Sequence, residues 1–249
     1  MFRVVVPARF ASTRLPGKPL ALLAGTPRVL HVHALALRSG AREVVVATDD
    51  ARIRDVCVSA GADVELTDRS HPSGTDRIAE VVARRGWASD SIVVNVQGDE
   101  PLLPPALIAQ AASLLESDRG AAIATLATPI ATAGEFRDPN VVKVVASGNG
   151  RALYFSRAPI PWERDDAAPL PRGARRHLGI YAYRVAALRQ LSQAPPSPLE
   201  RVERLEQLRA LQLGLVIAVA DACEAPGPGI DTPEDLERAE TLIQKATRG

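Results

Sequence analysis

The segment from Pro7 to Lys18, P-A-R-F-A-S-T-R-L-P-G-K, combines three cations with small residues and prolines. Arg9, Arg14 and Lys18 lie in one loop that follows a short apolar run, Arg3–Val6. Small residues let a ligand approach the backbone, and prolines restrict the shape of the loop. Fixed cations after a strand are suited to hold a polyphosphate at the carboxyl edge of a parallel sheet. The segment therefore predicts a nucleotide site, with a basic surface loop as the alternative.

This loop differs from two common nucleotide-binding motifs. Pro19 follows Lys18 where a P-loop has Ser or Thr, and no G-x-G-x-x-G of a dinucleotide-binding fold follows the first strand. The sequence thus indicates a nucleotide-binding loop of a third kind.

Two carboxylates stand where they could hold a metal ion. The segment Asn95–Pro101, N-V-Q-G-D-E-P, follows the most apolar predicted strand, so Asp99 and Gln97 should face the same crevice as the cationic loop. Asp231 precedes a predicted helix start that already accounts for the residues after it, which makes it the better second carboxylate. Mg²⁺ takes oxygen ligands from one or two carboxylates and from phosphates. The alternative for Asp99 is an ordinary turn.

A third group of residues could form a substrate pocket. Arg157 ends the segment Y-F-S-R, and H-L-G-I-Y places His177 and Tyr181 on either side of a glycine. Glu206 and Gln207 could project from the edge of a predicted helix. Taken singly, each is better explained as a paired histidine, a surface arginine or a helix salt bridge.

Composition excludes several classes of protein. The 249 residues carry a formal net charge of +1 and only 4% aromatic residues, which argues against a nucleic-acid partner. Cys57 and Cys223 match no metal-binding or redox spacing and predict free thiols in a reducing compartment. The short apolar run after the first methionine is typical of neither a signal peptide nor a membrane span. We expect a cytoplasmic protein without membrane insertion.

Apolar strands and amphipathic helices alternate through the first half of the chain. The predicted strands are short apolar runs: Arg3–Val6, Glu43–Ala47, Ala62–Leu66, Ser91–Val96 and Ala121–Leu126. The predicted helices between them are Pro27–Ser39, Asp50–Ala60, Thr75–Arg85 and Pro105–Ser117. This alternation predicts an α/β fold with a mostly parallel sheet covered on both faces.

The second half breaks this rhythm. Two strands at Val141–Ala146 and Ala152–Phe155 predict an inserted hairpin, and the charged, Pro- and Ala-rich segment 162–175 predicts an exposed loop. The remaining predicted elements are a helix at Ser197–Leu213, a strand at Leu215–Ala220 and a last helix at Pro233–Ala246. We expect residues 1–249 to form a single domain, in which the region at about 140–184 builds a substrate pocket or a subunit contact.

Six segments, taken together and in order, closely resemble the 3-deoxy-manno-octulosonate (Kdo) cytidylyltransferases, also called CMP-Kdo synthetases. They span Val4 to about Leu236 and are P-A-R-F-A-S-T-R-L-P-G-K, N-V-Q-G-D-E-P, Y-F-S-R-A-P-I-P-W, R-H-L-G-I-Y, S-P-L-E with L-E-Q-L-R, and G-I-D-T-P-E-D-L. One such motif could arise by chance, whereas six in order are highly specific. The chain departs from the family pattern at Pro72 and Asp76, near Ser73.

The resemblance implies a three-layer nucleotide-diphospho-sugar transferase fold, a homodimer and a Mg²⁺-dependent reaction. In that reaction CTP and Kdo give CMP-Kdo and pyrophosphate, for lipopolysaccharide synthesis. It implies nucleotide-binding roles for Arg9, Ser12, Arg14, Lys18, Ser73 and Gln97, and metal-binding roles for Asp99 and Asp231. The positions that match the Kdo pocket are Arg157, His177, Tyr181, Glu206 and Gln207.

These residues suggest direct in-line attack of the Kdo C2 hydroxyl on the α-phosphorus of CTP, with no covalent enzyme intermediate. The catalytic residues would be Arg14 and Lys18, which stabilise developing charge, with Asp99 and Asp231 on the metal. Three other functions are alternatives: a cytidylyltransferase for another acidic sugar such as a sialic acid, a non-catalytic nucleotide sensor, and a metal-dependent glycosyltransferase. The last would be expected to show D-x-D, whereas Glu100 and Pro101 follow Asp99.

Overall fold

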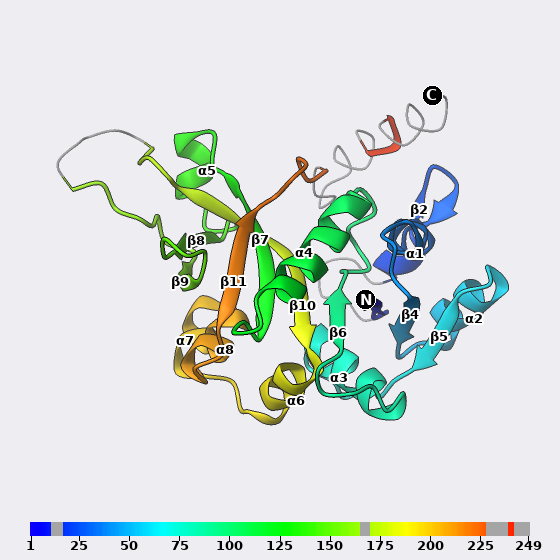
Figure 1. The fold of residues 1–249 in the computed structure, drawn as a ribbon. Helices are drawn as coiled ribbons and strands as arrows, with labels where there is room; N and C mark the ends of the chain where they lie inside the picture. Colours follow the sequence, from blue (N-terminus) through cyan, green and yellow to red (C-terminus); the bar gives the residue numbers. More distant parts are fainter. Residues whose placement is uncertain (11–16, 165–169, 228–238, 242–249) are drawn as a thin grey trace.

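Nine strands form one mixed sheet within the residues that the computed structural model describes, which are 1–10, 17–164, 170–227 and 239–241. Along the sheet the order is β11-β7-β10-β6-β1-β4-β5, and the pair β8–β9 joins it through β10. Every strand of the main path except β10 runs in the same direction, because β10 is antiparallel to both β6 and β7 while the other pairs are parallel. Figure 1 shows this sheet between its covering helices.

The strands of the main sheet are β1 (Phe2–Ala8), β4 (Glu43–Thr48), β5 (Asp63–Leu66), β6 (Ile92–Asn95), β7 (Ile123–Pro129), β8 (Lys143–Ala146), β9 (Ala152–Ser156), β10 (Arg175–Arg184) and β11 (Ile217–Asp221). A separate two-stranded ribbon consists of β2 (Leu22–Leu23) and β3 (Thr26–Pro27), next to the short 3-10 helix η1 (Lys18–Leu20). The five strands predicted in the first half are confirmed within a few residues, and so are the hairpin β8–β9 and the strand β11.

Helices cover both faces of the sheet and create two hydrophobic cores. The helices are α1 (Arg28–Arg38), α2 (Ala51–Ser59), α3 (Gly74–Arg84), α4 (Pro105–Ser117), α5 (Ala133–Arg137), α6 (Val185–Gln193), α7 (Pro198–Glu203) and α8 (Gln207–Gln212). One core packs α1, α2 and α4 against the sheet, and the other packs α3, α6 and α8 against its opposite face. The expected α/β architecture with two covered faces is therefore confirmed. Among the helices of the described residues, none combines the length and the apolar character that a membrane-spanning segment needs.

Short polar side chains begin several of these helices. Asp50, Ser73 and Thr132 each accept a hydrogen bond from a backbone N–H in the first turn of α2, α3 and α5. At α7, Ser197 and Glu200 form a reciprocal capping box. Such caps satisfy donors that have no partner inside the helix, so they fix where each helix begins. The start of α3 in particular lies at the edge of the sheet where the first strand ends.

The single helix predicted at Ser197–Leu213 is wrong. The structure has two short helices, α7 and α8, and Arg204 between them takes a left-handed backbone conformation with φ 56°. That residue ends α7, so the chain turns and presents Glu206 at the start of α8. The predicted last helix lies mostly outside the described residues, of which 239–241 are helical.

The buried amine of Lys143 holds together the chain segments on either side of the hairpin β8–β9. Its Nζ donates hydrogen bonds to the backbone carbonyls of Asp138 (2.9 Å), Val141 and Arg157 (2.7 Å), and its side chain is fully buried. Burial lowers the pKa of Lys143 from its usual value. A buried cation is tolerated when hydrogen bonds surround it, so this residue joins β8 to the chain beyond β9.

Candidate active site

The cationic loop and the N-V-Q-G-D-E-P segment meet at the carboxyl edge of the sheet. They line a first hollow of about 160 Å³ that includes Arg9, Lys18, Gln97 and Asp99. Lys18 lies at the start of η1 and Asp99 follows β6, so two segments far apart in sequence converge there. The structure thus brings together four of the predicted nucleotide and metal residues.

Lys18 and Asp99 form an ion pair in this hollow. The Lys18 Nζ donates to Asp99 Oδ2 at 2.8 Å, and the two side chains are 16% and 45% exposed. A pair so near the surface contributes little to stability, because water screens it. Its value is positional, since it holds a cation and a carboxylate side by side where a phosphate chain could lie.

Gly98 allows the two sides of the hollow to approach each other. A Cβ at this position would lie 2.8 Å from the backbone oxygen of Pro7, a distance that real Cβ atoms do not adopt. Any other residue would push the segment 97–99 away from the end of β1. The glycine therefore sets the spacing between Asp99 and the cationic loop.

Ser73 is held by the structure of helix α3. Its hydroxyl caps the helix by accepting from the Asp76 N–H at 3.2 Å, donates to Asp76 Oδ2 at 2.7 Å and lies 3.5 Å from Glu206 Oε1. The nearby backbone oxygen of Pro72 accepts a hydrogen bond from Arg9 at 3.5 Å. A contact between Ser73 and a nucleotide remains a prediction, and its present bonds are those of a helix cap.

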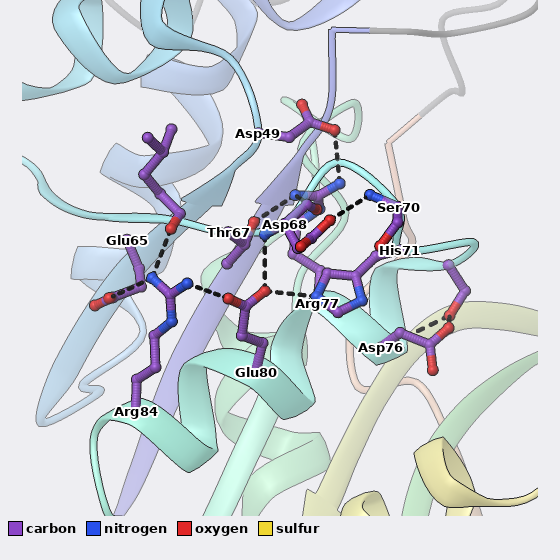
Figure 2. A network of polar contacts seen from close by, with 12 residues as sticks. Asp49, Glu65, Thr67, Asp68, Ser70, His71, Asp76, Arg77, Glu80 and Arg84 are labelled. Carbon is purple, nitrogen blue, oxygen red and sulfur yellow. Dashed lines mark hydrogen bonds and ion pairs between the residues drawn. The ribbon is translucent and has the colours of Figure 1, made fainter.

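Arg77 is a residue of this hollow that the sequence analysis missed. Its guanidinium is 3% exposed, bonds the Thr67 hydroxyl and pairs with Asp49 Oδ2 at 2.7 Å. Figure 2 shows this pair within a larger network in which Glu80 accepts from the Asp68 N–H and contacts His71 at 2.5 Å. The network ties the segment before α3 to the end of β4. The signal available in the sequence was an arginine among the apolar positions of a predicted amphipathic helix.

A second hollow adjoins the first and shares Gly74 and Gln97 with it. Its lining includes Tyr181, Glu206 and Gln207, three of the residues predicted for the sugar pocket. The Tyr181 ring stacks on Tyr183 with centroids 5.7 Å apart. Burial raises the pKa of Glu206, and it raises the pKa of Tyr181 well above its usual value. The Tyr181 phenol is therefore neutral at physiological pH, and both groups can exchange hydrogen bonds with hydroxyl groups.

His177 lies on β10 at the edge of a third hollow, which also includes Asp99. Its Nε2 lies 2.9 Å from the Thr125 hydroxyl, and the Phe155 ring packs edge-on against the imidazole with centroids 5.0 Å apart. Burial lowers the pKa of His177 to about 3. The imidazole is thus neutral at physiological pH and can act through hydrogen bonds, not through charge.

The third hollow also brings the chain before Asp231 close to Asp99. Pro226 and Gly227 line it together with Asp99 and Glu100. A Cβ at Gly227 would lie 2.5 Å from the Cβ of Leu102, so this close approach requires glycine. Pro226 and Gly227 are therefore fixed against the loop that carries Asp99.

Arg157 is not among the residues that line these three hollows. Its Nε donates to the Glu203 carbonyl at 2.7 Å and its Nη1 to the Pro139 carbonyl at 2.8 Å. These bonds join the hairpin to α7, and a contact with the sugar remains a prediction. The predicted residues Ser12, Arg14 and Asp231 lie outside the described residues.

The buried, neutral state of His177 gives a prediction for acid stability. In the unfolded chain the imidazole protonates near pH 6.5, whereas in the folded chain it does so only near 3. The unfolded state therefore binds more protons between these values, and stability falls as the pH is lowered through this window. In His177→Leu, the urea midpoint should fall less than in the wild type between about pH 7.5 and about pH 5. An equal fall in both proteins would contradict the buried neutral imidazole.

Comparison with known proteins identifies the family. A family model described as cytidylyltransferase matches residues 3–217. Relatives from Halorhodospira halophila and Thioalkalivibrio sulfidiphilus, both named 3-deoxy-manno-octulosonate cytidylyltransferase, are 56% and 54% identical over 98% of this chain and 97% and 99% of their own lengths. The chain belongs to the 3-deoxy-manno-octulosonate cytidylyltransferase family. The resemblance carried by the six motifs is thereby confirmed.

The solved structures agree with this family assignment. A structure of CMP:2-keto-3-deoxy-manno-octonic acid synthetase complexed with CTP superimposes with a TM-score of 0.90. The two sequences are 41% identical, and the match covers 99% of this chain and 100% of the other. The fold predicted from the family resemblance is confirmed by this match.

Proposed function

We propose that the protein transfers CMP from CTP to the anomeric C2 hydroxyl of Kdo and releases pyrophosphate. The observation that carries this proposal is that two hollows of different chemical character lie side by side and share Gln97 and Gly74 in their linings. One is lined by Arg9 and Lys18 and suits a triphosphate, and the other is lined by uncharged and acidic hydrogen-bonding groups and suits a sugar. The family's curated relatives carry the name of this activity.

The chain's own residues suit an in-line displacement that depends on positioning and charge. Lys18 would donate to the phosphate oxygens on which negative charge develops as pyrophosphate leaves, and Arg9 would help to bind the triphosphate. Tyr181, Glu206 and Gln207 would orient the sugar so that its C2 hydroxyl faces the α-phosphorus. His177 is neutral and can complete the sugar's hydrogen bonds. Arg14, for which the family resemblance implies a nucleotide-binding role, would add a third cation.

A divalent cation fits the carboxylate at the edge of the first hollow. Asp99 is 45% exposed and bonds Lys18 through Oδ2 only, among the contacts found in the described chain. Mg²⁺ usually takes one or two carboxylates from the protein and its other ligands from phosphates and water. Mg²⁺ bound there would neutralise phosphate charge and lower the pKa of an attacking hydroxyl. Asp231 follows Gly227 by four residues, so the Cα atoms of these two residues are at most about 14 Å apart.

The family resemblance also supports a proposal for the assembly and the location of the protein. We infer a homodimer that uses the predicted region 140–184, where Leu153 and Trp162 are 61% and 79% exposed. Large apolar side chains on a surface favour a protein contact. Sedimentation should give a dimer for the wild type and a larger monomer fraction for Leu153→Glu, and a monomeric wild type would contradict the proposed dimer.

The free thiols of Cys57 and Cys223 agree with a cytoplasmic location.

The decisive experiment measures pyrophosphate release from CTP, UTP, ATP or GTP, each paired with Kdo or a sialic acid, with and without EDTA. The proposal expects release with CTP and Kdo only, and none with EDTA. Release with CTP and the sialic acid would keep the chemistry and change the substrate. Nucleotide binding without release for any pair would favour a non-catalytic sensor.

A further inference from the structure

Asn95 is a polar residue at the end of an otherwise apolar buried strand. Its neighbours in β6, Val93 and Val94, are fully buried, and Asn95 itself is only 2% exposed. Its side-chain Oδ1 accepts no hydrogen bond from the part of the protein that the structure describes. The carboxamide therefore needs an explanation that local packing does not provide.

An unsatisfied buried acceptor is costly, because the lost interaction with water costs about 1–3 kcal/mol. Most buried polar groups in proteins avoid that cost through hydrogen bonds. Other buried polar groups here do so. The Thr125 hydroxyl is within hydrogen-bonding distance of the carbonyl oxygens of Leu178 (3.1 Å) and Ile180 (2.7 Å). The Lys143 amine donates to three backbone carbonyls. The Asn95 oxygen has no such partner among the described residues, which points to a partner that comes from outside the protein.

The position of Asn95 shows where that partner would bind. In the register of the sheet Asn95 lies between Val5 of β1 and Tyr181 of β10. It lines the second hollow, in which Tyr181, Glu206 and Gln207 are also found. Gln97, two residues further along the chain, lines the same hollow and the first one. The Asn95 amide thus lines the predicted sugar site, two residues from Gln97, which the sugar site shares with the predicted nucleotide site.

The chemistry of the hollow indicates what kind of group would bind. Its described lining contains no Lys, Arg or His, so a phosphate or carboxylate would find no cation there. It offers amides, two phenols, a threonine hydroxyl and a carboxyl group, whose hydrogen bonds suit hydroxyl groups. Because Oδ1 is an acceptor, its partner must be a donor. A hydroxyl of a neutral sugar portion satisfies each of these conditions.

We propose that the side-chain amide of Asn95 accepts a hydrogen bond from a hydroxyl of the acceptor sugar and so helps to select it. This inference rests on the proposed function of the site and adds a specificity-determining residue to it. An analogue without that hydroxyl would leave the buried acceptor unpaired. The site would therefore discriminate against such an analogue. The bond would act on the sugar and leave the binding of CTP unchanged.

The test compares wild type with Asn95→Leu, which replaces the amide by an apolar group of similar size. We expect the KM for Kdo to rise about tenfold and the KM for CTP to stay within about twofold. The melting temperature should stay unchanged or rise, because an unpaired buried acceptor is removed. Ser39→Ala is the matched control: Ser39 is also buried, its hydroxyl bonds Ala36, and both KM values should remain those of the wild type. Asn95→Ala is the second variant if the leucine disturbs folding.

Analogues of Kdo that each lack one hydroxyl complete the test. The wild type should bind one of these analogues about tenfold more weakly than it binds Kdo. Asn95→Leu should bind that analogue and Kdo equally well. An unchanged KM for Kdo in both variants would overturn the proposal, and so would an equal rise of both KM values with a lower melting temperature, since that indicates a structural role. If the wild type shows no turnover, the proposed function fails. Calorimetry of Kdo binding to both proteins with a non-reactive CTP analogue then still decides whether Asn95 contacts the sugar.

Discussion

Lys18→Met should lower kcat by about 100-fold or more at saturating CTP and Kdo, with a smaller change in the KM for CTP. The amine is mostly buried beside Asp99, where its charge is less screened than in water. Charge on the leaving pyrophosphate grows only as the reaction proceeds. A donor at that position therefore stabilises the transition state more than the bound substrate, and its loss affects kcat first. Steady-state pyrophosphate release measures both constants.

Arg42→Met is the matched control for this substitution. Arg42 is exposed and precedes β4, so it lies at the opposite edge of the sheet from the first hollow. Its removal changes the net charge of the protein by the same amount and should leave both constants within about twofold. A near-normal kcat for Lys18→Met would show that the amine only holds Asp99 in place. Equal losses in the two variants would indicate a general effect of net charge.

Local sequence patterns predicted the first half of the fold well and the second half less well. Continuous apolar runs such as Arg3–Val6 bury both faces of a strand, so the sequence alone indicates a parallel sheet. The break at Arg204 was missed because the apolar residues Leu199, Val202, Leu205 and Leu208 recur at helical spacing across it. In the structure, α7 buries none of its residues. No element was assigned to β10 or α6, although β10 is the only antiparallel strand of the main path. Its place between β6 and β7 depends on contacts distant in sequence, which local patterns do not contain.

The first hollow could be predicted because both of its segments follow strands whose carboxyl ends meet at one edge. This topology placed Lys18 and Asp99 together before any distance was known. The roles of Asn95 and Arg77 were missed for a different reason. Each is a polar residue within an apolar pattern, and its significance appears only when burial and hydrogen bonds show what satisfies it: Asp49 and Thr67 for Arg77, and no described protein group for the Asn95 oxygen.

The Asp99→Asn variant should lose about 1000-fold or more in kcat, the largest effect expected of any single substitution here. The amide has the size of the carboxylate and can still accept from Lys18, so the ion pair weakens but its geometry is kept. The negative charge that Mg²⁺ requires is lost. Calorimetry in the presence of CTP should show weaker Mg²⁺ binding to the variant. Asp90→Asn, at the opposite edge beside β6, is the control and should bind Mg²⁺ as the wild type does.

The double variant Lys18→Met/Asp99→Asn separates the two roles that Asp99 could have. If Asp99 served only to hold Lys18, its loss would reduce kcat no more than the loss of Lys18, the double variant would match Lys18→Met, and Mg²⁺ binding would be unchanged. That result would contradict the metal site. If Asp99 binds the metal, the double variant should be slower than Lys18→Met alone, because a second source of charge stabilisation is gone.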